Sequence, residues 1–213
     1  MFLILVAGVP ASGKSTYASY LGRKLRCPVI SKDKIKEKLF DTVGFNSREE
    51  KRKLDVCATE VMYMLAEADM KAGINVILDN NFENSSVPSL EKLLSATGAT
   101  PITVRFQGDM EIIYNRFVRR DSNPRRHRGH VVNTRYPEIE PEKYIPMGLE
   151  TFISRYTDRG MTTFSVGKLI TVDCTVPGSI DYYEVTKKVR ELIRVPYRRR
   201  DLSSSGAEQG TQR

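Results

Sequence analysis

The chain has 213 residues, of which 40% are hydrophobic and 28% are charged, and this composition excludes a disordered or fibrous protein. Its net charge is +8, and the excess is concentrated in two places: six arginines against one aspartate in residues 116–130, and four arginines against two acids in residues 198–213. A general nucleic-acid-binding protein usually spreads its positive charge along a face, so this distribution argues against that class.

The cysteines and the apolar segments indicate the cellular compartment in which the protein is expected. Cys27, Cys57 and Cys174 are scattered and show no metal-ligand spacing, which is typical of reduced thiols in a cytoplasmic protein. No apolar run reaches transmembrane length, and the apolar N-terminus lacks the basic start of a signal peptide. We therefore expect a cytoplasmic protein with no membrane partner.

The first predicted element is a buried parallel strand over Phe2–Ala7, because this run is apolar without alternation. It leads directly into Gly8–Thr16, which has the form G-x-x-x-x-G-K-[ST] of a phosphate-binding P-loop. Apolar residues then recur at helical spacing from Tyr17 to Leu25. A strand before the motif and a helix after it are the context that a P-loop requires, whereas a chance glycine-rich turn would not need either.

Each residue type in this motif has a physical reason. Gly8 and Gly13 allow tight turns that bring backbone N–H groups close to phosphate oxygens, and the start of the helix directs its positive dipole to the same place. Lys14 is expected to contact the β- and γ-phosphates, and Ser15 to offer its hydroxyl to Mg²⁺. The predicted nucleotide-binding residues are Gly8, Ala11, Ser12, Gly13, Lys14, Ser15 and Thr16.

A short second strand is predicted over Pro28–Ser31, and Asp33 follows it at the start of a helix. A carboxylate there could accept the proton of an attacking hydroxyl, and the same residue could also cap the helix N-terminus. After a break at Gly44, a long helix is predicted from Ser47, where Ser47 and Glu50 have the spacing of a capping box.

A third strand is predicted over Ile74–Asp79, and its final acid has the Walker-B position that holds Mg²⁺ or orients an acceptor. A hydrolytic ATPase is expected to place a glutamate next to this acid, but Asn80 and Asn81 follow here. The sequence therefore favours transfer to a hydroxyl over transfer to water. Asn81 either binds the substrate or forms part of a polar turn.

A helix over Val87–Ala96 and a strand over Ala99–Phe106 come next, followed by a helix from Met110 whose outer side becomes basic. Arg116 and Arg120 lie one turn apart on it, and residues 121–130 are expected to form a loop. We interpret residues 116–130 as a lid whose arginines neutralise the transferring phosphate. The alternatives are a solvated basic face and a nucleic-acid patch. No clear partner is predicted for His127 or His130.

The remaining predicted elements are a helix within Pro141–Tyr156, a fifth strand over Leu169–Asp173 and a last helix over Ile180–Ile193. Alternating strands and helices predict an α/β protein with a three-layer P-loop NTPase fold: a mostly parallel five-stranded sheet, helices on both faces and a basic lid. One kinase domain is expected over residues 1–197, and a disordered basic tail over 198–213. Ligands should bind at the carboxyl ends of the strands.

These motifs together resemble the small P-loop kinases related to the 5′-kinase domain of polynucleotide kinase and, more distantly, the zeta-toxin kinases. The resemblance covers about residues 1–175 as an order of motifs. It implies a general base at Asp33, acceptor binding by Asp79 and Asn81, and a donor-phosphate contact from Arg120, with Arg116 as the next candidate. The family commonly has an arginine near Asp33, where this chain has lysines: Lys32, Lys34 and Lys36.

The sequence therefore predicts a kinase that uses ATP and Mg²⁺. Its catalytic residues would be Lys14, Asp33, Arg116 and Arg120; Ser15 and Asp79 would hold the metal; Asp33, Asp79 and Asn81 would bind the acceptor. The near-neutral remainder of the chain favours a small molecule or nucleotide as acceptor, whereas the basic lid and tail would suit a nucleic-acid 5′-hydroxyl. Two other classes stay open: an ATP-binding switch without transfer, and an RNA-binding accessory protein.

Overall fold

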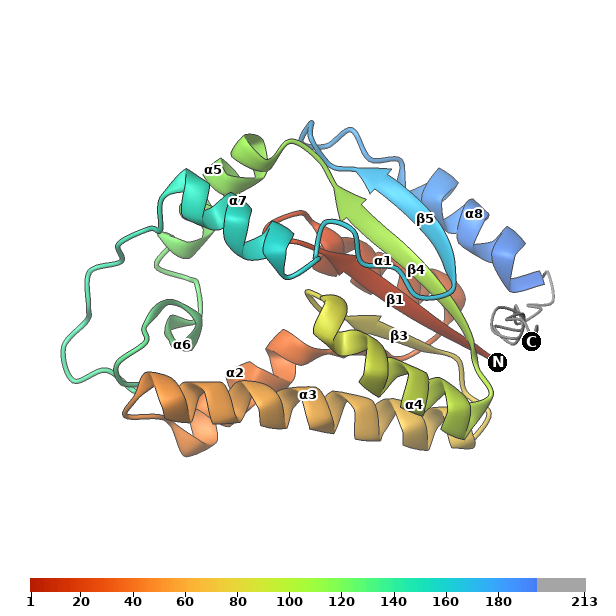
Figure 1. Cartoon of the computed structure of the whole chain (residues 1–213), viewed down its shortest axis with the longest axis horizontal. Helices are drawn as coiled ribbons and strands as arrows, with labels where there is room; N and C mark the ends of the chain where they lie inside the picture. Colours follow the sequence, from red (N-terminus) through yellow and green to blue (C-terminus); the bar gives the residue numbers. More distant parts are fainter. Residues whose placement is uncertain (195–213) are drawn as a thin grey trace, which may run out of the picture.

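The computed structural model describes residues 1–194, so the predicted basic tail lies outside the described residues. A central sheet has the strand order β2-β3-β1-β4-β5, and every neighbouring pair is parallel (Figure 1). This confirms the predicted five-stranded α/β sheet. Its strands are β1 (Phe2–Gly8), β2 (Val29–Ser31), β3 (Val76–Asp79), β4 (Thr100–Gln107) and β5 (Lys168–Asp173).

Helices cover both faces of the sheet. Those on one face contribute to a core with Ile4 and Val6, and those on the other face to a core with Leu3 and Leu5. The first group is α1 (Lys14–Leu25), α5 (Met110–Asp121), α7 (Leu149–Asp158) and α8 (Tyr182–Arg194); the second is α3 (Arg48–Lys71) and α4 (Val87–Thr97). Two further helices, α2 (Lys32–Val43) and α6 (Arg128–Val131), flank the site, and a 3₁₀ turn spans Asn84–Ser86.

The central strand β1 explains why helices pack on both faces of the sheet. Its residues from Leu3 to Gly8 are all buried, and successive side chains enter opposite cores. A strand buried on both faces needs apolar residues at every position, which is the pattern that the sequence shows. Strand β1 ends at the P-loop, so the motif lies at the carboxyl edge of the sheet.

Several element boundaries differ from the sequence-based predictions. Strand β3 begins at Val76, because Ile74 is 43% exposed and precedes the sheet. The helix predicted within residues 141–156 begins only at Leu149, and 141–148 has no regular secondary structure. Pro141 and Pro146 explain this, since proline lacks an N–H donor and disfavours helical geometry in the preceding residue.

The predicted loop 121–130 contains the beginning of a short helix, α6. The ring Nδ1 of His127 accepts a hydrogen bond from the N–H of Gly129 at 3.1 Å and so caps this helix. Gly129 packs against Phe40 so closely that a Cβ atom would lie 2.3 Å from its ring. The lid segment is therefore folded against α2 (Figure 1).

The N-terminus of α3 carries the predicted cap with one change. Ser47 Oγ accepts from the N–H of Glu50, but the Glu50 carboxylate accepts from the N–H of Asn46 rather than from that of Ser47. The cap starts helix α3 next to Phe45, which exchanges two backbone hydrogen bonds of 2.8 Å with Tyr136, a residue that follows the lid and α6. Within residues 1–194, no helix is long and apolar enough to span a membrane.

Candidate active site

The P-loop has the backbone geometry of an anion-binding turn. Gly8, Ala11 and Gly13 have positive φ angles of 139°, 65° and 91°. A Cβ atom on Gly8 would lie 2.6 Å from the carbonyl oxygen of Phe106, which explains the requirement for glycine there. No side chain caps the N-terminus of α1 at Gly13, so the first N–H groups of this helix are open to a ligand.

Lys14 is buried, with 6% of its surface exposed. Burial lowers the pKa of its ammonium, the neighbouring Asp79 and Asp33 oppose this shift, and Arg120 and Arg126 add to it. A buried ammonium next to two guanidinium groups is stabilised by an anion. The geometry therefore fits the phosphate contact predicted for Lys14.

Asp79 lies at the end of β3, where the sheet register brings it beside Val6 and Ser31. Its Oδ1 accepts a hydrogen bond from Ser15 Oγ at 3.1 Å, and its Oδ2 accepts one from Ser31 Oγ at 3.1 Å. Burial raises the pKa of Asp79, against the effect of Lys14 and of both hydroxyls. Ser15 and Asp79 were predicted from their motifs, whereas Ser31 belongs to no motif in the sequence and was not predicted.

The donor set around Asp79 fits Mg²⁺. A hydroxyl oxygen and a carboxylate oxygen are hard ligands, and they lie within hydrogen-bonding distance of each other next to the P-loop. Residues 1–194 contain no group of three or more histidine, cysteine, aspartate or glutamate side chains that could hold a metal by themselves.

Asp33 lies in the first turn of α2, two residues after the N-cap position, which Ser31 occupies. The alternative interpretation of Asp33 as the N-cap is therefore wrong. Burial would raise the pKa of Asp33, but Lys36, His130, Lys14 and Arg126 outweigh it and hold this pKa well below its ordinary value. The side chain is 42% exposed and faces the cavities described below.

The lysines around Asp33 are positioned by an acid that the sequence analysis missed. Asp55 of α3 accepts from Lys32 Nζ and Lys36 Nζ, each at 2.9 Å. Lys36 Nζ also lies 3.6 Å from Asp33 Oδ1. Lys36 thus links the acid of α3 to Asp33, in the region where the resemblance implies an arginine.

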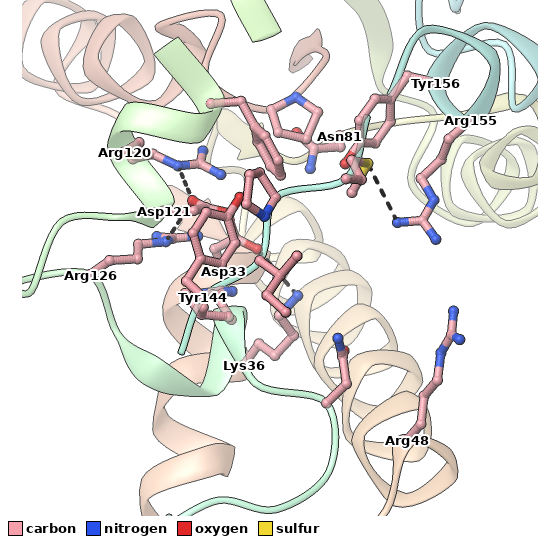
Figure 2. Close-up of a pocket in the computed structure, with 18 of the residues that line it drawn as sticks. Asp33, Lys36, Arg48, Asn81, Arg120, Asp121, Arg126, Tyr144, Arg155 and Tyr156 are labelled. Atoms are coloured by element: carbon pink, nitrogen blue, oxygen red, sulfur yellow. Dashed lines mark hydrogen bonds and ion pairs between the residues drawn. The ribbon is translucent and has the colours of Figure 1, made fainter. Parts of the chain in front are cut away.

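Three lid arginines take two different positions. Arg120 Nε lies 2.7 Å from Asp121 Oδ1, and Arg126 Nε lies 3.5 Å from the same oxygen. Arg116 instead donates to the carbonyl oxygen of Thr175, beyond β5. Arg120 and Arg126 are therefore held together by the buried Asp121 (Figure 2), and Arg116 is held apart from them.

Both histidines have acidic partners on α2. His127 Nε2 lies 3.0 Å from Asp41 Oδ1, and His130 Nε2 lies 2.7 Å from Glu37 Oε1. Arg126 approaches the same Glu37 oxygen at 3.8 Å. The expectation that the histidines have no clear partner is wrong. A signal was present in the sequence, because Glu37 and Asp41 lie one turn apart and therefore share a face of the predicted helix.

Two cavities adjoin at this site. The first, which we call the P-loop cavity, has a volume of about 450 Å³ and is lined by the P-loop, Ser31, Asp79 and Arg116. The second, which we call the lid cavity, has a volume of about 420 Å³, and Arg120, Asp121 and Arg126 of the lid line one side of it (Figure 2). Four side chains line both cavities: Lys14, Asp33, Arg120 and Arg126.

The cavities separate the other predicted residues. Asp79 lines only the P-loop cavity, which favours its metal assignment over acceptor binding, and Arg116 lines only that cavity as well. Asn81 lines only the lid cavity, where its Oδ1 is buried without a hydrogen-bond partner in the described chain. An unpaired buried amide oxygen favours ligand binding over a simple polar turn.

Comparison with known proteins identifies the family. Residues 3–135 match the family model described as an AAA domain, and the chain belongs to this family. A structure from Chloroflexus aurantiacus J-10-fl, described as a candidate kinase, is 30% identical over 89% of this chain and 97% of its own, with a TM-score of 0.75. No curated protein matches the sequence.

Two more distant structures share the fold. A sugar kinase from Janibacter sp. HTCC2649 is 12% identical, with a TM-score of 0.54, over 91% of this chain and 94% of its own. Shikimate kinase from Bacteroides thetaiotaomicron is 14% identical, with a TM-score of 0.52, over 91% and 99%. The fold is thus that of a small P-loop kinase, and the narrower resemblance to polynucleotide kinases stays a prediction.

Proposed function

We propose that this protein is a kinase that uses ATP and Mg²⁺ to phosphorylate a hydroxyl group. The observation that carries the proposal is the junction of the two cavities at Lys14, Asp33, Arg120 and Arg126. A lysine that would contact phosphate, a carboxylate that would act as the base and two guanidinium groups meet there. They lie between a cavity for the nucleotide and a cavity for the acceptor. The 30% identical structure described as a candidate kinase supports the same class.

The P-loop cavity would bind the nucleotide. Backbone N–H groups of residues 11–16 and Lys14 would contact the phosphates, and Ser15 and Asp79 would hold Mg²⁺, with Ser31 orienting the Asp79 carboxylate. The metal supplies neutralisation of charge on the phosphate oxygens when it is bound. Arg116, fixed on the Thr175 carbonyl, would line the nucleotide space away from the transferred group.

Asp33 would act as the general base. Its depressed pKa keeps the carboxylate ionised at neutral pH, and a triphosphate placed beside Lys14 would raise that pKa toward the working range. The acceptor hydroxyl would lie in the lid cavity, within reach of this carboxylate. Asn81, with its free buried oxygen, would orient the acceptor.

Arg120 and Arg126 would stabilise the transferring phosphoryl group, because they adjoin both cavities. The sequence-based prediction gave this role to Arg116 and Arg120, and the proposal gives it to Arg126 in place of Arg116. Asp121 would hold the two guanidinium groups in place before the nucleotide binds. Residues 116–130 would serve as the lid, anchored on α2 through His127 and His130.

The test is transfer of labelled γ-phosphate from ATP to a panel of nucleosides, small hydroxylated metabolites and 5′-hydroxyl oligonucleotides. We expect label in an acceptor with the wild type and none with Lys14→Ala, which removes the phosphate contact. Free phosphate as the sole product, or ATP binding without turnover on the whole panel, would contradict a kinase and favour an ATP-binding switch.

A further inference from the structure

The lid cavity carries more positive charge than the transfer step uses. Six lysine or arginine side chains and two carboxylates line it within the described chain. Three of the cations, Lys14, Arg120 and Arg126, also line the P-loop cavity and would face the donor phosphates. Lys36 is paired with Asp33 and Asp55. The two cations that remain are Arg48 and Arg155.

Arg48 and Arg155 approach the cavity from two elements. Arg48 begins α3 and Arg155 lies in the last turn of α7. Figure 2 shows both on the side of the cavity opposite Arg120 and Arg126, each pointing toward the other. Neither has an acidic partner within residues 1–194, and the closest polar contact of Arg155 is the Met147 sulfur at 4.0 Å. Two unpaired guanidinium groups at one opening would be stabilised by a shared anion.

The space between these arginines and Asp33 has the lining of a small-molecule site. Phe117, Tyr144 and Tyr156 line the cavity, and its volume of about 420 Å³ matches a small ligand. The hydroxyl of Tyr144 and the Oδ1 of Asn81 are both buried without a partner in the described chain. Burial raises the pKa of Tyr144 to about 12, so its hydroxyl stays protonated and can donate to a ligand.

We propose that the phosphate acceptor is a small hydroxylated compound that carries a carboxylate or phosphate group, bound by Arg48 and Arg155. This inference rests on the proposed kinase function. The acceptor hydroxyl gives its proton to the Asp33 carboxylate, and its oxygen forms a bond to the γ-phosphorus. The bond from that phosphorus to the β–γ bridging oxygen breaks, and ADP leaves with the electron pair.

The test compares acceptors in pairs that differ by one anionic group: glycerate with glycerol, ribose 5-phosphate with ribose, and a nucleoside 3′-monophosphate with its nucleoside. A 5′-hydroxyl oligonucleotide is included as a polymeric acceptor. Transfer of γ-phosphate is measured for the wild type, Arg48→Gln, Arg155→Gln and the double variant. Arg52→Gln is the matched control, since Arg52 lies exposed one turn later on α3 and does not line the cavity.

We expect the wild type to favour the anionic member of at least one pair. Each arginine variant should raise the KM for that compound about tenfold or more, as expected for the loss of a charge-assisted hydrogen bond. The KM for ATP and the transfer to the neutral member should stay unchanged, and Arg52→Gln should behave as the wild type. A phosphate and a carboxylate acceptor are distinguished by which pair responds.

Three results would overturn the inference while leaving the kinase in place: equal or better transfer to the neutral members, an unchanged KM in the double variant, or transfer to the oligonucleotide alone. Absence of transfer to every acceptor, despite ATP binding, would instead overturn the proposed function itself.

Discussion

Lys14 and Asp33 are held in environments that leave the site short of negative charge. Burial lowers the pKa of the Lys14 ammonium, while surrounding cations hold the pKa of Asp33 below its ordinary value. The first shift comes chiefly from burial, to which Arg120 and Arg126 add, and the second comes from the positive groups Lys36, His130, Lys14 and Arg126. A triphosphate relieves this imbalance, which is why we regard the site as built for an anionic ligand.

Ser31 lies outside the P-loop, so its proposed role in orienting Asp79 can be tested without changing that motif. It donates to Asp79 Oδ2 at 3.1 Å, so Ser31→Ala leaves that carboxylate oriented by Ser15 alone. We expect the Mg²⁺ concentration for half-maximal activity to rise about two- to tenfold, the effect of one lost hydrogen bond. A magnesium titration of the transfer rate measures this.

The control for that titration is Ser154→Ala, because Ser154 is exposed on α7 and bonds only to a carbonyl of its own helix. An unchanged magnesium requirement in Ser31→Ala would show that Ser31 does not orient the Asp79 carboxylate.

Among the site residues, those that belong to contiguous sequence motifs could be predicted from the sequence. The P-loop and Asp79 could be identified because each ends an apolar strand. Ser31 could not, because its partnership with Asp79 depends on the pairing of β2 with β3. Asp55 and Asp121 were missed for a similar reason, since their partners follow from helix packing and from the fold of the lid.

At the scale of elements, the lid segment is folded onto α2 rather than extended from the sheet. Phe40, Phe45 and Val132 form a small core of their own, with Tyr136 packed against it. Lys51 of α3 donates to the carbonyl oxygens of His130 and Val132. These contacts lie beyond Asp121, which pairs with Arg120 and Arg126, and they fix the segment that follows the two arginines.

Gly129 tests this packing. In Gly129→Ala the new methyl group would meet the Phe40 ring at 2.3 Å, so the lid segment or Phe40 must shift. We expect a loss of about 1–3 kcal/mol in the free energy of unfolding, as for other overpacked sites, and slower phosphoryl transfer. Denaturant unfolding and the transfer assay measure the two effects.

Gly148→Ala is the matched control, because a Cβ atom there meets nothing within 4 Å. A smaller loss, below about 1 kcal/mol, is expected from its N-cap position on α7. Equal effects of the two substitutions would contradict the packing argument.

Burial of His130, which bonds to Glu37, makes the anchoring of the lid depend on pH. Burial lowers the pKa of His130 from its ordinary 6.5, with Glu37 and Asp33 opposing and Arg126 and Lys36 adding to the shift. The unfolded chain then binds the proton more readily, so this contribution to stability is lost as the pH falls below 6.5. The hydrogen bond from His130 depresses the pKa of Glu37, whose contribution is lost below its ordinary 4.5.

We therefore expect the unfolding free energy of the wild type to decrease between pH 7 and pH 5, and to decrease less in His130→Gln, whose amide keeps a donor for Glu37 but does not titrate. Denaturant unfolding at a series of pH values measures both slopes. Identical slopes in the two proteins would contradict the assignment.

Element types were predictable where periodicity was strong, and boundaries were not. The long helix from residue 48 and the parallel strands follow from apolar patterns that tertiary packing reinforces. The prediction for 141–156 placed the helix too early because its apolar residues outweighed the prolines. Helix α6 was missed because its cap is a histidine ring and its packing partner is Phe40.

For the whole molecule, the parallel sheet gathers the site at one edge. Strands β1, β2 and β3 end at the P-loop, Ser31 and Asp79, and α2 then carries Asp33 into the junction. Figure 1 shows α6 between α5 and α7 on one side and α2 and α3 on the other. The order of motifs allowed the sheet to be predicted, whereas the second cavity depends on how the lid folds back.

Because the P-loop lies at the centre of the sheet, a bound nucleotide should stabilise the whole domain. At an ATP·Mg²⁺ concentration of 100 times its Kd, stability should increase by about 2.7 kcal/mol, or roughly 5–10 °C in Tm. Thermal unfolding with and without ATP measures this. Lys14→Ala should show little increase, and an equal increase in that variant would contradict the placement of the phosphates.

The most direct test of the account is the Asp33→Asn variant, assayed for both ATP binding and phosphoryl transfer. We predict that ATP binding is retained while kcat falls about 10²–10⁴-fold, as expected for the loss of a general base. The exposed Asp158→Asn substitution on α7 is the control and should leave both unchanged. Wild-type turnover in Asp33→Asn would contradict the assignment of the base and the meaning given to the junction of the two cavities.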